Sequence, residues 1–154
     1  MELSSIIRPA AVKVISNVTS KKRLFQDLGD VFASTYGMDT AKAFSALQER
    51  ESLGPTGVGH GVALPHARLP NLLQVVGAFI RVERPFEFES VDHQPVDLVF
   101  ALFAPEGSGV EHLKALALVS RTMRDNSICA KLRANADPAT LHAVLTEGPS
   151  TKAA

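Results

Sequence analysis

Residues 54–68 read Gly54-Pro55-Thr56-Gly57-Val58-Gly59-His60-Gly61-Val62-Ala63-Leu64-Pro65-His66-Ala67-Arg68. The glycines predict tight turns and a close approach of the backbone to another segment. The apolar run 62–64 predicts a short buried strand, which Pro65 ends because proline lacks the N–H that a central strand donates. His66 is therefore expected on a loop just past the end of a strand, with Arg68 as a cation on the same loop. This pattern is typical of a chain that presents one imidazole at the mouth of a site.

The composition limits the class of protein. A length of 154 residues indicates one domain, and a hydrophobic content of 45% is enough to build a core. The 16 basic and 16 acidic residues balance to a formal net charge of zero, which argues against binding nucleic acid through its phosphates. The single cysteine, Cys129, excludes an internal disulfide and fits a reducing cytoplasm.

The two ends of the chain carry no targeting pattern. Residues 1–9 lack the basic and apolar regions of a secretory signal, and no apolar run approaches the length of a membrane span. We therefore expect a cytoplasmic protein without membrane insertion. The domain is expected over residues 1–147, and the small, polar residues 148–154 are expected to form a flexible tail.

Apolar periodicity predicts an alternation of helices and strands. A strand is expected over 11–15, followed by helices over 20–36 and from Asp39 to about Glu51. Further strands are expected over 72–82, as a half-exposed segment at 86–88, and over 96–103, where a continuous apolar run indicates burial on both faces. Helices are expected over 108–125, 127–133 and 138–145. This order predicts a single-domain α/β sandwich in which helices flank a mixed β-sheet.

The helix expected over 108–125 has two further predicted properties. Ser108 and Glu111 match the capping-box pattern at its start. Its apolar residues surround much of the helix, which predicts that it is largely buried; they are Leu113, Leu116, Ala117, Val119 and Met123.

Three histidines are candidates for chemistry. An imidazole can act as a base, a metal ligand or a nucleophile towards phosphorus. His66 leads because of its placement, although a loop histidine with one hydrogen bond fits the spacing equally well. His112 falls in the first turn of a helix, where the positive end of the dipole favours an anion and a neutral imidazole, but a helix-surface position is the alternative. His60, between two glycines, is interpreted as a turn residue. His93 is interpreted as a surface turn, and His142 has no evident partner.

The residues around His66 resemble a known family. The segments 56–59 and 61–66 are similar to the active-site signature of phosphotransferase-system EIIA domains of the mannitol/fructose type. Arg50-Glu51 precedes them at the family spacing, and the family's second and third conserved blocks resemble residues 86–102 and Pro105 with His112-Leu113. The chain most resembles a lone EIIA domain of the nitrogen-regulatory branch. It differs in carrying His60 where Asn is usual and Ala67 where Gly is usual, so the residue after His66 does not need a positive φ.

The resemblance implies a phosphocarrier with a mannitol/fructose EIIA-like fold. His66 would accept a phosphoryl group on Nε2 from the phosphohistidine of an HPr-like donor protein, and the phosphorylation state would signal to regulatory partners. His112 would be the auxiliary histidine, and Arg50 would stabilise the charge of the phosphoryl group. The loop of Thr56, Gly57, Gly59, His60 and Gly61 would surround the phosphate, and Arg68 would contact a partner. No metal or other cofactor is implied, because phosphohistidine is already activated. A monomer or weak dimer is expected.

Two other functions fit some of these residues. A metal-dependent hydrolase would use His60, His66 and His112 as zinc ligands, but the chain lacks a paired-histidine helix motif with a partner carboxylate. A protein-binding module that is never phosphorylated would keep the fold without the chemistry. The presence of both His66 and His112 counts against that interpretation.

Overall fold

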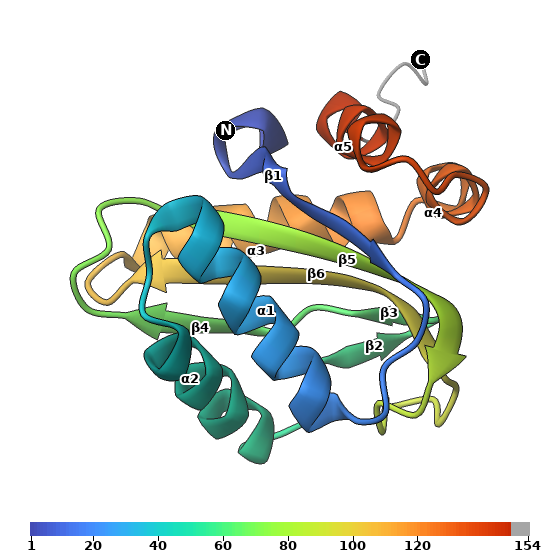
Figure 1. Ribbon diagram of the computed structural model, residues 1–154. Coiled ribbons are helices and arrows are strands. Elements are labelled where there is room, and N and C mark those ends of the chain that lie inside the picture. The colour runs from blue at the N-terminus through green and yellow to red at the C-terminus, as the bar shows by residue number, and fades with distance from the viewer. Residues whose placement is uncertain (149–154) are drawn as a thin grey trace.

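The computed structural model describes residues 1–148 and contains a six-stranded sheet (Figure 1). Five strands follow the order β1-β5-β6-β3-β2, and β4 also pairs with β6. The strand bounds are β1 (Ile7–Ile15), β2 (Gly57–Gly59), β3 (Val62–Ala63), β4 (His66–Leu69), β5 (Val76–Phe86) and β6 (Val96–Pro105). Strands β5 and β6 are antiparallel, whereas β1 runs parallel to β5 and both β3 and β4 run parallel to β6. The predicted mixed sheet is therefore confirmed.

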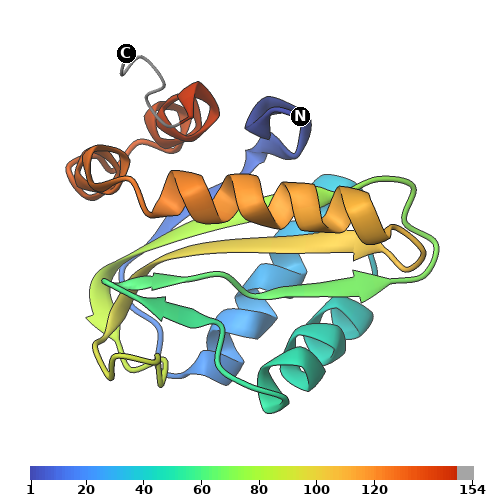
Figure 2. The ribbon, with the colours of Figure 1, turned by 180° about the vertical axis from the view of Figure 1, so that it is seen from behind.

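Helices cover both faces of this sheet. The helical elements are η1 (Leu3–Ser5), α1 (Lys21–Tyr36), α2 (Thr40–Ser52), α3 (Gly109–Met123), α4 (Asn126–Arg133) and α5 (Pro138–Glu147). Helices α1 and α2 lie side by side over one face (Figure 1), and α3 crosses the opposite face (Figure 2). Helix α5 contacts β1 and η1. Among the described residues, no helix combines the length and the apolar character that crossing a membrane requires.

Side chains next to the helix ends explain why most helices begin where the sequence predicts. Ser20, Asp39 and Asp137 each accept a hydrogen bond from a backbone N–H in the first turn of their helix. Gly37 ends α1 in the left-handed conformation, with φ of 72°. Helix α4, predicted from residue 127, begins at Asn126 and is capped by Asp125. The Ser108 hydroxyl donates to the Pro105 carbonyl instead of capping α3, so the predicted capping box does not form.

Strand β6 is the centre of the core. Its residues from Leu98 to Ala104 are almost completely buried, as the continuous apolar run predicts. Strands β3 and β4 pair with β6 in one unbroken register, in which Ala63 lies opposite Val99 and His66 opposite Leu102. Strands β3 and β4 thus behave as one strand that is interrupted at Leu64 and Pro65. Within the interruption, the Pro65 carbonyl still accepts a hydrogen bond from the Leu102 N–H.

Several predictions about burial and strand limits are wrong. The strand expected from residue 72 begins at Val76, and Leu73 in the preceding loop is 97% exposed. The half-exposed strand expected at 86–88 does not form: Phe86 ends β5, and Phe88 lies outside any strand yet is fully buried against Phe25. Only one side of α3 is buried, since Leu113 is 63% exposed and Ala117 is also exposed.

Two further points concern the last part of the chain. His142 does have a partner, because its Nε2 lies 3.0 Å from the Ile7 carbonyl and so ties α5 to β1. Gly148, the first residue of the expected tail, ends α5 with φ of 76°. The rest of the expected flexible tail, residues 149–154, lies outside the described residues.

Candidate functional site

A cleft of about 610 Å³ lies between helix α2, strand β4 and the start of α3. Helix α2 contributes one continuous face to it, which the sequence analysis did not identify as functional. The residues that line the cleft are Lys42, Ser45, Ala46, Glu49, Arg50, Leu53, His66, Ala67, Arg68, Leu69, Pro70, Glu106 and His112. Four predicted site residues therefore meet in one place: His66, His112, Arg50 and Arg68.

The backbone beside His66 fixes which ring nitrogen carries the proton. His66 is the first residue of β4, not a loop residue as predicted, and it is half-buried. Its Nδ1 lies 2.8 Å from the Leu64 carbonyl oxygen, which can only accept a hydrogen bond. Nδ1 therefore carries the hydrogen, and Nε2 keeps the lone pair. Ala67 takes a negative φ, as the sequence predicts.

The surroundings of His66 also favour its neutral form. Burial lowers the pKa of its imidazole below the ordinary 6.5. The hydrogen bond to the Leu64 carbonyl and the Glu51 carboxylate oppose this shift, whereas the Arg50 guanidinium adds to it. A neutral imidazole with Nδ1–H and a lone pair on Nε2 is a nucleophile at neutral pH.

His112 lies beside His66 rather than on the helix surface. It belongs to the first turn of α3, is only 7% exposed, and its ring centroid lies 5.8 Å from that of His66. Burial lowers the pKa of His112, and Arg68 and His66 lower it further. Its buried Nδ1 has no hydrogen-bond partner among the described residues. The alternative of a surface histidine is therefore wrong.

Cationic side chains approach the cleft from two elements. Arg50, in the last turn of α2, is half-buried, and its Nη1 donates to the Gly54 carbonyl at 3.0 Å. Arg68 is exposed on β4. Lys42, which the sequence analysis did not single out, lies on the same face of α2 as Arg50, two turns earlier. The spacing of Lys42, Ser45, Ala46, Glu49, Arg50 and Leu53 is the sequence signal that identifies this face.

The structure places the predicted phosphate-site loop elsewhere. Thr56, Gly57, Gly59, His60 and Gly61 do not line the cleft. A Cβ on Gly57 would overlap Ser90, and one on Gly61 would overlap the Arg133 and Asp97 side chains, so both glycines permit close packing. His60 is a turn residue, as predicted, with φ of 56°. Its N–H donates to Asp92, and its carbonyl accepts from Arg133.

The histidines do not form a metal centre. Among residues 1–148, no group of three or more His, Cys, Asp or Glu side chains is placed to hold a metal ion. The hydrolase alternative, which needs His60, His66 and His112 as joint zinc ligands, is therefore without structural support.

Comparison with known proteins agrees with this geometry. The profile of the family "Phosphoenolpyruvate-dependent sugar phosphotransferase system, EIIA 2" matches residues 5–148. A nitrogen regulatory protein of Bradyrhizobium diazoefficiens is 46% identical over 153 residues, which cover 99% of this chain and 100% of that protein.

Solved structures show the same fold. The nitrogen regulatory protein IIA-Ntr from Neisseria meningitidis aligns with a TM-score of 0.87 at 35% identity, over 94% of this chain and 99% of that one. Enzyme IIA for mannitol from Escherichia coli, solved with phosphorylated enzyme IIB, aligns with a TM-score of 0.76 over 92% of this chain and 99% of that one. At 16% identity, this second likeness concerns the fold alone. The predicted resemblance and fold class are confirmed, and the chain belongs to the EIIA type 2 family of the phosphoenolpyruvate-dependent sugar phosphotransferase system.

Proposed function

We propose that this chain is a phosphocarrier of the nitrogen-regulatory kind and that Nε2 of His66 accepts its phosphoryl group. The observation that carries the proposal is the 2.8 Å contact between His66 Nδ1 and the Leu64 carbonyl, which leaves the Nε2 lone pair available in the cleft. The name of the 46% identical relative, a nitrogen regulatory protein, supports a role in nitrogen regulation.

In the proposed reaction the donor is a phosphohistidine of an HPr-like protein. The Nε2 lone pair of His66 attacks phosphorus, a new N–P bond forms, and the N–P bond of the donor breaks. The donor imidazole leaves with the electron pair of that bond. The proton on His66 Nδ1 stays in place and, because it is shared with the Leu64 carbonyl, stabilises the positive charge that the ring gains. The protein is thus a covalent intermediate in phosphoryl transfer.

The other cleft residues stabilise charge in this proposal. A transferring phosphoryl group spreads negative charge over three oxygens and needs positioned donors more than bond-making help. Arg50 supplies a fixed cation, and His112 supplies a neutral imidazole at the start of α3. Arg68, exposed at the cleft, is placed to contact the donor protein.

Regulation would follow from the charge of the product. Phosphorylation adds about −2 at neutral pH to a cleft that holds Lys42, Arg50 and Arg68. Partner proteins would distinguish the two forms by this change. The mannitol enzyme IIA structure, which contains a phosphorylated protein partner, is consistent with partner binding by this fold. We place the protein in the cytoplasm, where such donors act and where Cys129 remains a free thiol.

Phosphorylation of the purified protein tests the proposal. The protein is incubated with phosphoenolpyruvate, the general phosphotransferase enzyme and an HPr-like carrier, and intact mass is followed. One phosphoryl group is expected, lost in acid and stable in alkali as an N–P bond requires. His66→Ala should fold and take up none, whereas His93→Asn, a change on a surface turn, should be labelled as the wild type is.

Two outcomes would overturn the proposal. Labelling of His66→Ala at the wild-type rate would mean that another side chain is the acceptor, His60 first. A wild-type protein that takes up no phosphoryl group would favour the protein-binding module. A pull-down that compares both forms of the protein then identifies the regulatory partners.

A further inference from the structure

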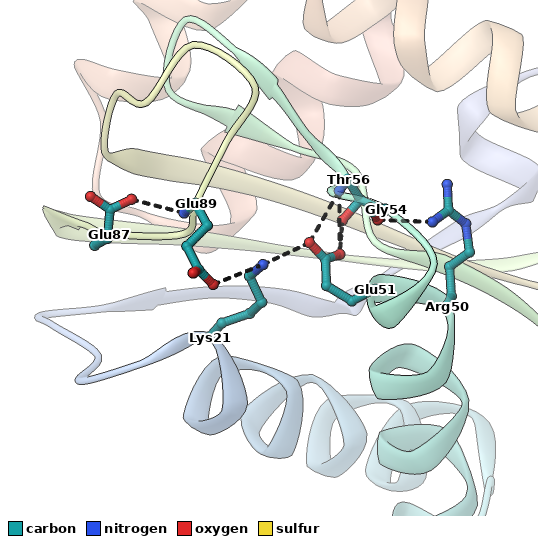
Figure 3. Close-up of polar contacts among 7 residues, drawn as sticks. All are labelled: Lys21, Arg50, Glu51, Gly54, Thr56, Glu87 and Glu89. Carbon is teal, nitrogen blue, oxygen red and sulfur yellow. Dashed lines mark hydrogen bonds and ion pairs between the residues drawn. The ribbon is translucent and has the colours of Figure 1, made fainter.

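Glu51 follows Arg50 in the sequence but takes no part in lining the cleft. Its carboxylate accepts hydrogen bonds from the backbone N–H and the hydroxyl of Thr56 (Figure 3). It also accepts from the Lys21 ammonium at 2.8 Å. The Glu51 side chain is only 7% exposed. It is therefore a buried carboxylate that accepts hydrogen bonds from two separate parts of the chain.

The Lys21 side chain is itself held in place. Its ammonium lies 4.6 Å from the centre of the Phe88 ring, and Phe88 is fully buried. A second contact, 3.5 Å to the carboxylate of Glu89, is at the surface, since Glu89 is 79% exposed. The helix α1 cation is thus fixed mainly by Glu51 and Phe88.

The segment that Glu51 holds, residues 54–56, supports both active-site side chains. The Gly54 carbonyl accepts from Arg50 Nη1 at 3.0 Å (Figure 3). The Thr56 carbonyl accepts from the Leu64 N–H at 2.9 Å, and the Leu64 carbonyl accepts from His66 Nδ1. One short segment therefore anchors the guanidinium at one end and, through Leu64, the imidazole at the other.

The segment has few other restraints. Pro55 has no N–H, and the Gly54 N–H is used to bond the Glu51 carbonyl at the end of α2. The Thr56 N–H is the remaining backbone donor of residues 54–56, and it is the one that Glu51 takes. Gly54, with φ of 159°, lies in a bend just after the end of α2.

We propose that Glu51, held by Lys21, is a positioning residue that sets the Arg50 guanidinium relative to the His66 imidazole through residues 54–56. The proposal rests on the proposed function, because positioning matters here for phosphoryl transfer. Charge stabilisation by a guanidinium depends on its placement, and a shift of about 1 Å costs on the order of 100-fold in rate.

Glu51→Gln tests the proposal, since it keeps the shape of the side chain and removes the charge that Lys21 and Thr56 share. Single-turnover phosphorylation is measured over a range of donor concentrations. The rate at saturating donor should fall about tenfold to 100-fold, while the donor concentration that gives half the maximal rate should stay unchanged. Glu89→Gln, which removes the exposed partner of Lys21, is the matched control and should behave as wild type.

A double variant separates positioning from general weakening of the fold. If Glu51 acts through Arg50, adding Glu51→Gln to Arg50→Ala should cost much less than it costs in the wild type. Thr56→Val, which removes one of the three donors to Glu51, is the second variant if Glu51→Gln does not fold. It should slow saturated transfer in the same direction.

An independent readout uses the ¹⁵N shifts of the His66 ring without any donor. The wild type should show the Nδ1–H tautomer, and Glu51→Gln should show a mixture of the two tautomers. Unchanged saturated rates, or effects that add fully to those of Arg50→Ala, would overturn the proposal. If the wild type itself takes up no phosphoryl group, the proposed function fails, and the tautomer measurement still decides the role of Glu51: an unchanged tautomer would refute it.

Discussion

The rings of His66 and His112 lie 5.8 Å apart, centroid to centroid, although one residue begins strand β4 and the other lies in the first turn of α3. Burial lowers the pKa of both imidazoles, and the neighbouring His66 lowers the pKa of His112 further. The pair is thus arranged to be neutral at neutral pH. In the proposed function, His66 keeps a nucleophilic nitrogen and His112 donates to the oxygens of the incoming group.

Replacing His112 tests this division of roles. His112→Ala should slow phosphorylation of His66 by about 100-fold to 1,000-fold, the usual effect of losing one donor to a charged transition state. The protein should still become fully phosphorylated after long incubation, as followed by intact mass. If no phosphorylated protein forms at all, His112 is more than an auxiliary group.

The lowered pKa values predict how stability depends on pH. Because the unfolded imidazoles have the ordinary pKa of 6.5 and the folded ones a lower pKa, the unfolded state binds more protons below pH 6.5. The contribution of both histidines to stability is therefore fully present above pH 6.5 and is lost as pH falls towards the folded pKa values. Urea unfolding of the wild type between pH 7.5 and about 5 should show this decrease.

The variant that isolates this effect is His66→Gln combined with His112→Gln. Its free energy of unfolding should fall less over the same pH range than that of the wild type. Equal slopes in the two proteins would mean that the two imidazoles titrate normally.

His60→Asn tests the place of the glycine-rich loop. His60 has φ of 56°, a conformation that asparagine also tolerates, and its contacts to Asp92 and Arg133 use backbone atoms. Stability and the rate of His66 phosphorylation should therefore both stay close to wild type, measured by thermal unfolding and by intact mass. A large drop in rate with unchanged stability would show that His60 does act on the phosphoryl group.

Local signals made the helices predictable. The residues at the helix ends form hydrogen bonds within one turn of their own helix, as Ser20, Gly37, Asp39 and Asp137 do. A short window of sequence therefore contains everything that sets these helix ends. Burial within β6 was equally clear, because seven successive apolar or small residues from Leu98 to Ala104 have no polar face to expose.

Non-local contacts explain what the sequence did not predict. Leu73 is apolar yet exposed. Phe88 is buried against Phe25 and Lys21, which lie more than 60 residues earlier in the chain. His66 and Arg50 were recognised by motif, but their meeting in one cleft depends on the pairing of β4 with β6 and on the packing of α2 against β4. No window of sequence contains these pairings.

The unbroken register of β3 and β4 on β6 limits what phosphorylation can change. Ala63 and His66 keep the same offset to Val99 and Leu102 across the break at Pro65, so the position of the proposed acceptor His66 is fixed by pairing with the buried strand β6. Moving His66 by a single residue would turn it to the other side of the sheet. The backbone that carries His66 is therefore held in place by strand pairing on both sides of Pro65. A partner protein that distinguishes the two forms would therefore respond to the added negative charge at His66, not to the movement of a helix or strand.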